Sequence, residues 1–152
     1  MSTIVANELT STLEQEFTYN LNNRAHIGGF YPYLLMYNAP TGTFKIEILQ
    51  GANVIYYKTF TSSDIKTAIG TTDNYAITFF PIIPTTPIQI EKGSYKIKLS
   101  SDGYTYSSSS YLAWIQQHEN VQNTMSYTPV GDGENSLAFR IKTYKEGVLC
   151  EF

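Results

Sequence analysis

Residues 43–60 have the sequence TFKIEILQGANVIYYKTF, and this stretch indicates a β-hairpin. Its first half alternates Phe44, Ile46 and Ile48 with polar residues, the period-two pattern of a strand with one face on a core and one face in water. Residues 50–53 have turn chemistry, and residues 54–60 are rich in β-branched and aromatic side chains. Two strands joined by a short glycine-containing turn predict an antiparallel hairpin.

The same kind of pattern recurs along the whole chain. Strict alternation is found at residues 16–21, 94–99 and 137–142, and looser β-rich runs are found at residues 31–37, 75–80 and 111–117. With the hairpin, these runs make about eight short strands. Eight strands without a helical layer predict an all-β fold, an antiparallel two-sheet sandwich of the jelly-roll type. The apolar positions predict a core that contains Phe44, Ile46, Ile48, Tyr95, Ile97, Leu99, Leu112, Trp114, Phe139 and Ile141.

One short helix is predicted near residues 62–70. Ser62 or Ser63 is the expected cap, and Gly70 is the expected end. The apolar edge of this helix would consist of Ile65, Ala68 and Ile69.

Composition and charge exclude several classes of protein. The chain has 152 residues and a formal net charge of −3, which gives no basic footprint for nucleic acid. No stretch approaches the roughly 20 apolar residues of a membrane span. Cys150 is the only cysteine, so no intramolecular disulfide and no cysteine-based metal cage can form. The 13 tyrosines and 18 threonines favour pleated, half-buried surfaces over helices.

Residues 1–12 are predicted to form an N-terminal arm, and residues 13–152 a single jelly-roll domain. The arm is polar, and the connection from residue 120 to 136 is long for a compact domain. Ordering a backbone residue costs roughly 1–2 kcal/mol, so both segments are expected to gain contacts from other subunits. The alternative is that both fold back on their own sandwich. The expected partner-interface residues are Ile4, Val5, Leu9, Val121, Met125 and Tyr127.

Catalytic and metal-binding motifs are missing from the sequence. His26 and His118, the two histidines, lack any metal-ligand spacing, and neither a G-x-S-x-G motif nor a glycine-rich phosphate loop is present. We therefore expect no enzymatic activity, no cofactor and no transition metal. Calcium coordination stays open, by the oxygen atoms of Asp132, Glu134 and Asn135 or by those of Asp64, Asp73 and Asn74. A glycan-cleaving enzyme is a weaker alternative, since it needs two carboxylates that converge in one groove.

Tyrosines flank a run of four serines at residues 107–110. Tyr104, Tyr106 and Tyr111 lie on either side of this run in an expected loop. Tyrosine combined with serine and glycine is typical of binding surfaces, because tyrosine brings contact area and a hydroxyl at low entropic cost. We expect these three residues to bind a glycan or a protein partner, or else to fold over the edge of the sandwich.

Four short motifs carry a resemblance to a known group of proteins. They are APTGTFKIEI at residues 39–48, GSYKIKL at 93–99, YLAW at 111–114 and LAFRI at 137–141. Their order resembles that of jelly-roll β-sandwich modules of bacterial and tailed-phage virion proteins, which are similar in architecture to carbohydrate-binding modules. The likeness covers about residues 13–145 and implies a jelly-roll fold. Residues 1–10 lack the basic and apolar regions of a secretory signal, which together with this resemblance favours a virion location.

Two functions follow as expectations. The first is a non-enzymatic phage virion structural protein, a capsid decoration or cement protein or a tail appendage subunit. Its partners would be other virion proteins and copies of itself. The alternative is a carbohydrate-binding module that attaches to host surface glycans through Tyr104, Tyr106, Tyr111 or Tyr127. The two are compatible, because a virion protein can also contact a receptor.

Overall fold

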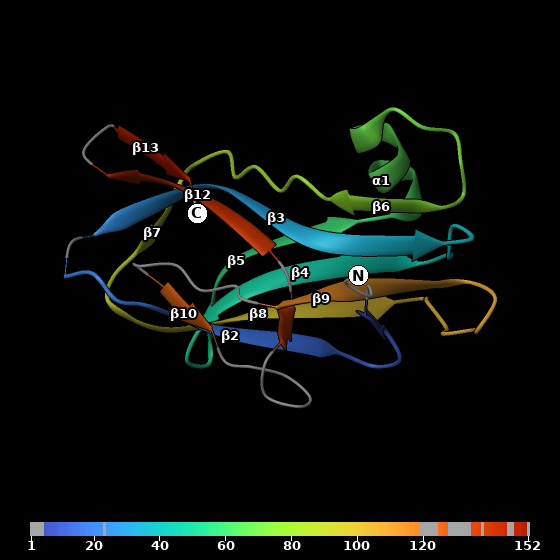
Figure 1. The fold of residues 1–152 in the computed structure, drawn as a ribbon, viewed down its shortest axis with the longest axis horizontal. Helices are drawn as coiled ribbons and strands as arrows, with labels where there is room; N and C mark the ends of the chain where they lie inside the picture. The colour runs from blue at the N-terminus through green and yellow to red at the C-terminus, as the bar shows by residue number, and fades with distance from the viewer. Residues whose placement is uncertain are drawn as a thin grey trace.

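A computed structural model describes residues 5–22, 24–118, 125–127, 135–137, 139–145 and 148–151. The chain forms two antiparallel β-sheets, with one short helix beside them in the part that is described (Figure 1). The predicted all-β sandwich is therefore confirmed. No helix within the described ranges is long and apolar enough to cross a membrane.

The described strands outnumber the eight that were expected, because several short segments join the sheets. They are β1 (Val5–Glu8), β2 (Leu13–Tyr19), β3 (Ala25–Tyr37), β4 (Thr43–Gln50), β5 (Asn53–Phe60), β6 (Ala76–Phe79), β7 (Ile88–Ile90), β8 (Gly93–Asp102), β9 (Tyr111–His118), β10 (Met125–Tyr127), β11 (Asn135–Leu137), β12 (Phe139–Lys145) and β13 (Val148–Glu151). The helix α1 (Ser62–Ile69) follows β5.

Eight of these strands have the jelly-roll arrangement. In the first sheet β1 pairs with β9, β9 with β3, and β3 with β6 on its other edge. In the second sheet the order is β2-β8-β4-β5. The chain thus changes sheet at almost every step, so that the first of the eight strands lies beside the last and the second beside the seventh. The hairpin predicted at residues 43–60 is the β4–β5 pair, with Gly51 at a φ of 62° in its turn.

The core lies between the two sheets and contains all ten residues expected there. Phe139 joins the layers, since its ring centroid is 5.7 Å from that of Phe17 in the second sheet and 5.4 Å from that of Phe30 in the first. A buried polar bond also spans the layers: the backbone N–H of Leu137 donates to Oε1 of Gln15 at 2.8 Å. This bond satisfies a polar side chain that would otherwise destabilise the core.

The N-terminal segment differs from the predicted arm. Val5–Glu8 form β1, which pairs with β9 of the same chain, and Leu9 is fully buried in the core. The backbone N–H of Leu9 donates to the carbonyl of Leu112 at 2.8 Å. The boundary expected after residue 12 therefore falls between β1 of the first sheet and β2 of the second, inside one sandwich, and Leu9 is not available to a partner subunit. Ile4 lies outside the described residues.

The later segment also pairs with its own sandwich where it is described. Met125–Tyr127 form β10, which extends the second sheet beside β2, with Met125 opposite Tyr19 and Tyr127 opposite Phe17. This arrangement matches the alternative in which the segment folds back. Val121 lies outside the described residues.

Helix α1 ends where the sequence predicts but begins with a different cap. Gly70 is the C-cap, with a φ of 70°, as expected. The N-cap is Thr61 rather than Ser62 or Ser63, because Asp64 completes a capping box with Thr61. Ile65 is buried, whereas Ala68 and Ile69 of the expected apolar edge are exposed.

Candidate functional site

Four tyrosine rings form a continuous row at one end of the first sheet. The ring centroids of Tyr106 and Tyr111 are 5.8 Å apart, and Tyr111 stacks on Tyr37 at 5.2 Å. Tyr75 follows, with its ring perpendicular to that of Tyr37 at 6.3 Å. We call these four residues the tyrosine row. Its centre is set by strand register, because Tyr111 of β9 lies directly opposite Tyr37 of β3.

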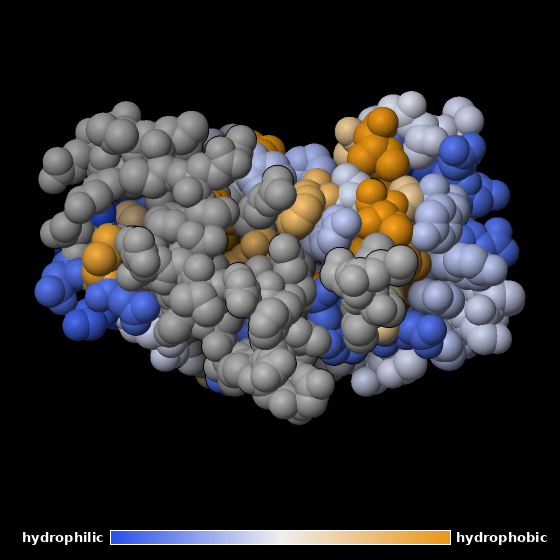
Figure 2. Space-filling view, in the orientation of Figure 1, coloured by the Kyte–Doolittle hydropathy of each residue, from blue (hydrophilic) through white to orange (hydrophobic). Residues whose placement is uncertain are grey.

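The row continues an apolar cluster on the outward face of the first sheet. Leu35, Ala113 and Ile115 are buried there, with Tyr33 and Tyr111 packed against them. The alternate residues of β3 and β9 belong to the main core, so these two central strands are apolar on both faces. Figure 2 shows apolar side chains, in orange, gathered over β6 and α1 beside polar side chains in blue. The two central tyrosines, Tyr37 and Tyr111, therefore stand on paired strands, whereas Tyr75 and Tyr106 lie in the adjoining loops.

The row ends at a shallow pocket with polar walls. The pocket has a volume of about 350 Å³ and is lined by Tyr37, Asn38, Asp73, Asn74 and Tyr75. Tyr37 and Tyr75 are 40% and 52% exposed, so their rings are open to a ligand. The pocket thus combines two aromatic walls with amide and carboxylate groups that can fix the orientation of a ligand.

Backbone strain is concentrated at the rim of this pocket. Asn38 and Ala39 have φ values of 54° and 37°, although neither is glycine, and Ala39 precedes Pro40, which disfavours this geometry further. Hydrogen bonds hold the turn: Asn38 Nδ2 donates to the carbonyl of Ser109 at 3.1 Å, and Ala39 N–H to that of Asn74 at 2.9 Å. Strain kept in place in this way is frequent at ligand-binding positions.

The other end of the row is tied to β1. The hydroxyl of Tyr106 donates a hydrogen bond to Oε2 of Glu8. This bond is the main cause that raises the pKa of Tyr106 to about 12. Burial, and then the charge of Glu8, raise the pKa of Tyr111 as well. Both hydroxyls are protonated at neutral pH, and the single proton of Tyr106 is already donated to Glu8.

The structure divides the three tyrosines predicted for glycan binding. Tyr106 and Tyr111 lie together in the row. Tyr104 does not, because its ring packs edge-on against Phe44 at 5.1 Å and its hydroxyl donates to the carbonyl of Leu9 at 2.8 Å. Tyr104 therefore closes the edge of the sandwich, as the alternative for these residues proposed.

Sequence reasoning missed Tyr37 and Tyr75, which complete the row and form the walls of the pocket. A signal for Tyr37 was present in the alternation of Tyr33, Leu35 and Tyr37 opposite the core-facing residues of β3. For Tyr75, which precedes the short strand β6, no such pattern exists.

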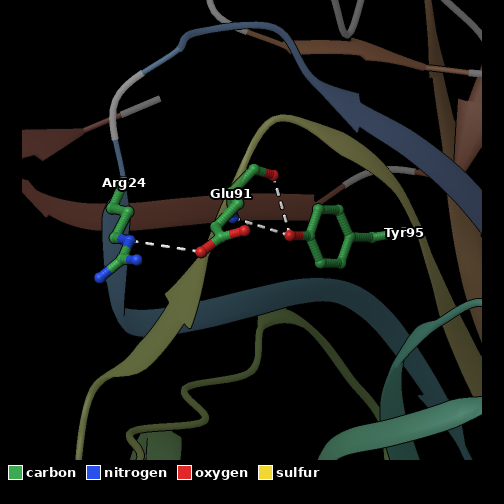
Figure 3. A network of polar contacts seen from close by, with 3 residues as sticks. All are labelled: Arg24, Glu91 and Tyr95. Carbon is green, nitrogen blue, oxygen red and sulfur yellow. Dashed lines mark hydrogen bonds and ion pairs between the residues drawn. The ribbon is translucent and has the colours of Figure 1, made fainter.

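A second polar cluster, at the junction of β7 and β8, pairs its groups with one another. Tyr95 donates to the carbonyl of Glu91 at 2.9 Å and accepts from the N–H of Glu91 at 2.8 Å (Figure 3). The Glu91 carboxylate pairs with Arg24 at 3.3 Å, and both side chains are mostly exposed. An exposed pair of this kind adds little stability and offers no cleft.

Among the described residues, no group of three histidine, cysteine, aspartate or glutamate side chains is placed to hold a metal ion.

Comparisons with known proteins add no family to this geometry. No protein-family model matches the chain, and no curated protein matches it.

Proposed function

We propose that this protein is a non-enzymatic glycan-binding module whose tyrosine row and adjoining pocket form the binding site. The observation that supports this most is the row of four rings, which leads into a pocket with carboxylate and amide groups. A sugar has apolar ring faces and a rim of hydroxyls. It can therefore pack against a tyrosine ring while its hydroxyls bond to the polar walls.

The position of the tyrosines lowers the cost of binding. Tyr37 and Tyr111 are held on paired strands, and each is in contact with a neighbouring ring. A side chain that is already ordered loses little conformational entropy when a ligand arrives. The same residues on a loose loop would lose more on binding.

Substitution of a pocket tyrosine tests the proposal. We expect wild-type protein to bind a subset of oligosaccharides on a glycan array and Tyr75→Ala to weaken that binding at least about tenfold, equivalent to about 1.4 kcal/mol. Tyr57→Ala is the matched control, because Tyr57 is 62% exposed but lies on β5 of the second sheet. Binding that survives Tyr75→Ala and is lost in Tyr57→Ala would contradict the proposed site.

A second candidate function is that of a structural subunit of a phage capsid or tail. It is the first function expected from the sequence. The observation that favours it is the exposure of two isoleucines, Ile69 and Ile83, 39% and 53% exposed, which neighbouring subunits would bury. Measuring the mass of the native particle in solution tests it. A stable oligomer that dissociates in Ile83→Ser supports a structural role, and a monomer at micromolar concentration contradicts it.

A further inference from the structure

We propose that the pocket at the end of the tyrosine row selects a neutral, hydroxyl-rich sugar ring and rejects sugars that carry a carboxylate or sulfate. This inference rests on the proposed glycan-binding function and assigns the chemical class of its ligand. The hydrogen-bonding groups that the pocket leaves for a ligand support it.

The carboxylate of Asp73 is the first of these groups. The backbone N–H of Asp73 donates to Oγ1 of Thr71 at 3.0 Å, and no hydrogen bond or ion pair within the described residues occupies its side chain. An ionised carboxylate only accepts hydrogen bonds, so it requires a ligand with donors. Sugar hydroxyls are such donors, whereas an anionic substituent brings acceptors and a like charge.

The two amide side chains complement the carboxylate. Asn74 Oδ1 already accepts from Nζ of Lys66 at 2.5 Å, so its NH₂ group is left to donate. Asn38 Nδ2 donates to the carbonyl of Ser109, so its Oδ1 is left to accept. A pocket that offers both donors and acceptors suits hydroxyl groups, because each hydroxyl can do both.

The charges around the row agree with a neutral ligand. The ammonium of Lys66 donates to Oδ1 of Asn74, and within the described residues it forms no ion pair with Asp73. No arginine is among the described residues that line the pocket, so they offer no bidentate fork to a carboxylate or sulfate. At the other end of the row the carboxylate of Glu8 accepts from Tyr106. An anionic chain along the row would thus meet a carboxylate at each end.

Paired glycans test the inference. Neutral oligosaccharides and their uronate, sialylated or sulfated counterparts should be compared by calorimetry with the full chain. We expect each anionic member to bind at least tenfold more weakly than its neutral partner. Affinity for the neutral member should change little with added salt, because no charge pair is formed.

Two aspartate variants test the selectivity, and the pattern of binding separates failure of this inference from failure of the glycan-binding function. Asp73→Asn should reduce the discrimination against anionic sugars at least threefold, whereas Asp102→Asn, an exposed aspartate of the second sheet, should leave it unchanged. Equal or tighter binding of anionic sugars overturns the inference but leaves the glycan-binding function intact. Absence of binding to every sugar tested overturns both.

Discussion

At the scale of single residues, tyrosines with the same side chain have three different roles. Tyr104 is partly buried and closes the sandwich edge, Tyr106 is tied to Glu8, and Tyr75 is more than half exposed at the pocket. The local sequence around them does not distinguish these roles. Each role depends on which residues the fold places beside the tyrosine ring.

Tyr106 should ionise late in an alkaline titration. Its pKa is raised to about 12, and hydrogen bonding to Glu8 is the main cause. Because the folded-state pKa exceeds the unfolded value of about 10, the stabilising effect is complete below pH 10 and is lost as the pH rises through about 12. A difference titration by ultraviolet absorbance between wild type and Tyr106→Phe should isolate one late transition. In Glu8→Gln the midpoint of that transition should fall toward the ordinary tyrosine pKa of about 10. An unchanged midpoint would contradict hydrogen bonding to Glu8 as the cause.

Gly42 should tolerate a side chain less well than Gly51. Both have a positive φ, 105° and 62°, but a Cβ at Gly42 would lie 2.8 Å from the backbone of Gly103, whereas a Cβ at Gly51 meets nothing within 4 Å. We expect Gly51→Ala to cost about 1 kcal/mol of unfolding free energy and Gly42→Ala about 2–4 kcal/mol. Urea denaturation measures both losses of unfolding free energy. Equal losses would show that the backbone segments at Gly42 and Gly103 are not in close contact.

At the scale of elements, the long alternating strands could be predicted and the short ones could not. Residues 43–48 and 94–99 show by their period-two alternation which face is buried, and every core residue expected from them is buried. Strand β1 has four residues, and its partner β9 lies more than 100 positions later, so its pairing has no local signal. The tyrosine row has the same origin, because it depends on the register between β3 and β9.

The free edge of the second sheet has features that oppose the addition of a strand. Lys58 of β5 lies opposite buried Ile46, which places a charged residue on the core-facing side of the edge strand. The register between β4 and β5 also shifts at Ile48 and Leu49. Inward charges and bulges are devices that prevent edge-to-edge pairing. An assembly built by extending this sheet is therefore disfavoured.

Leu9 should stabilise the monomer rather than an interface. It is fully buried in the core directly after β1, so Leu9→Ala should cost about 2–5 kcal/mol of unfolding free energy. Val54→Ala on β5, 46% exposed, is the control and should change stability by less than about 0.5 kcal/mol. If Leu9→Ala melts like wild type, the N-terminal segment does not belong to the sandwich.

At the scale of the whole molecule, the two sheets depend on aromatic packing between them. Phe139 touches Phe17 and Phe30, one from each sheet, so Phe139→Ala should cost about 3–5 kcal/mol in a denaturant titration. A loss below about 1 kcal/mol would show that β12 does not close the core. The inner faces of both sheets thus stabilise the fold, and the proposed binding site lies on the outward face of the first sheet.

An NMR titration of the wild-type protein with a neutral oligosaccharide selected on the array tests most directly whether the tyrosine row is the binding site. The account predicts that the largest shifts occur in the backbone amides of Tyr37, Asn38, Asn74, Tyr75 and Tyr111. Amides of the second sheet, such as those of Thr59 and Ser100, should not move. Shifts concentrated on the second sheet, or no shifts at saturating sugar, would contradict the assignment of the tyrosine row as the binding site.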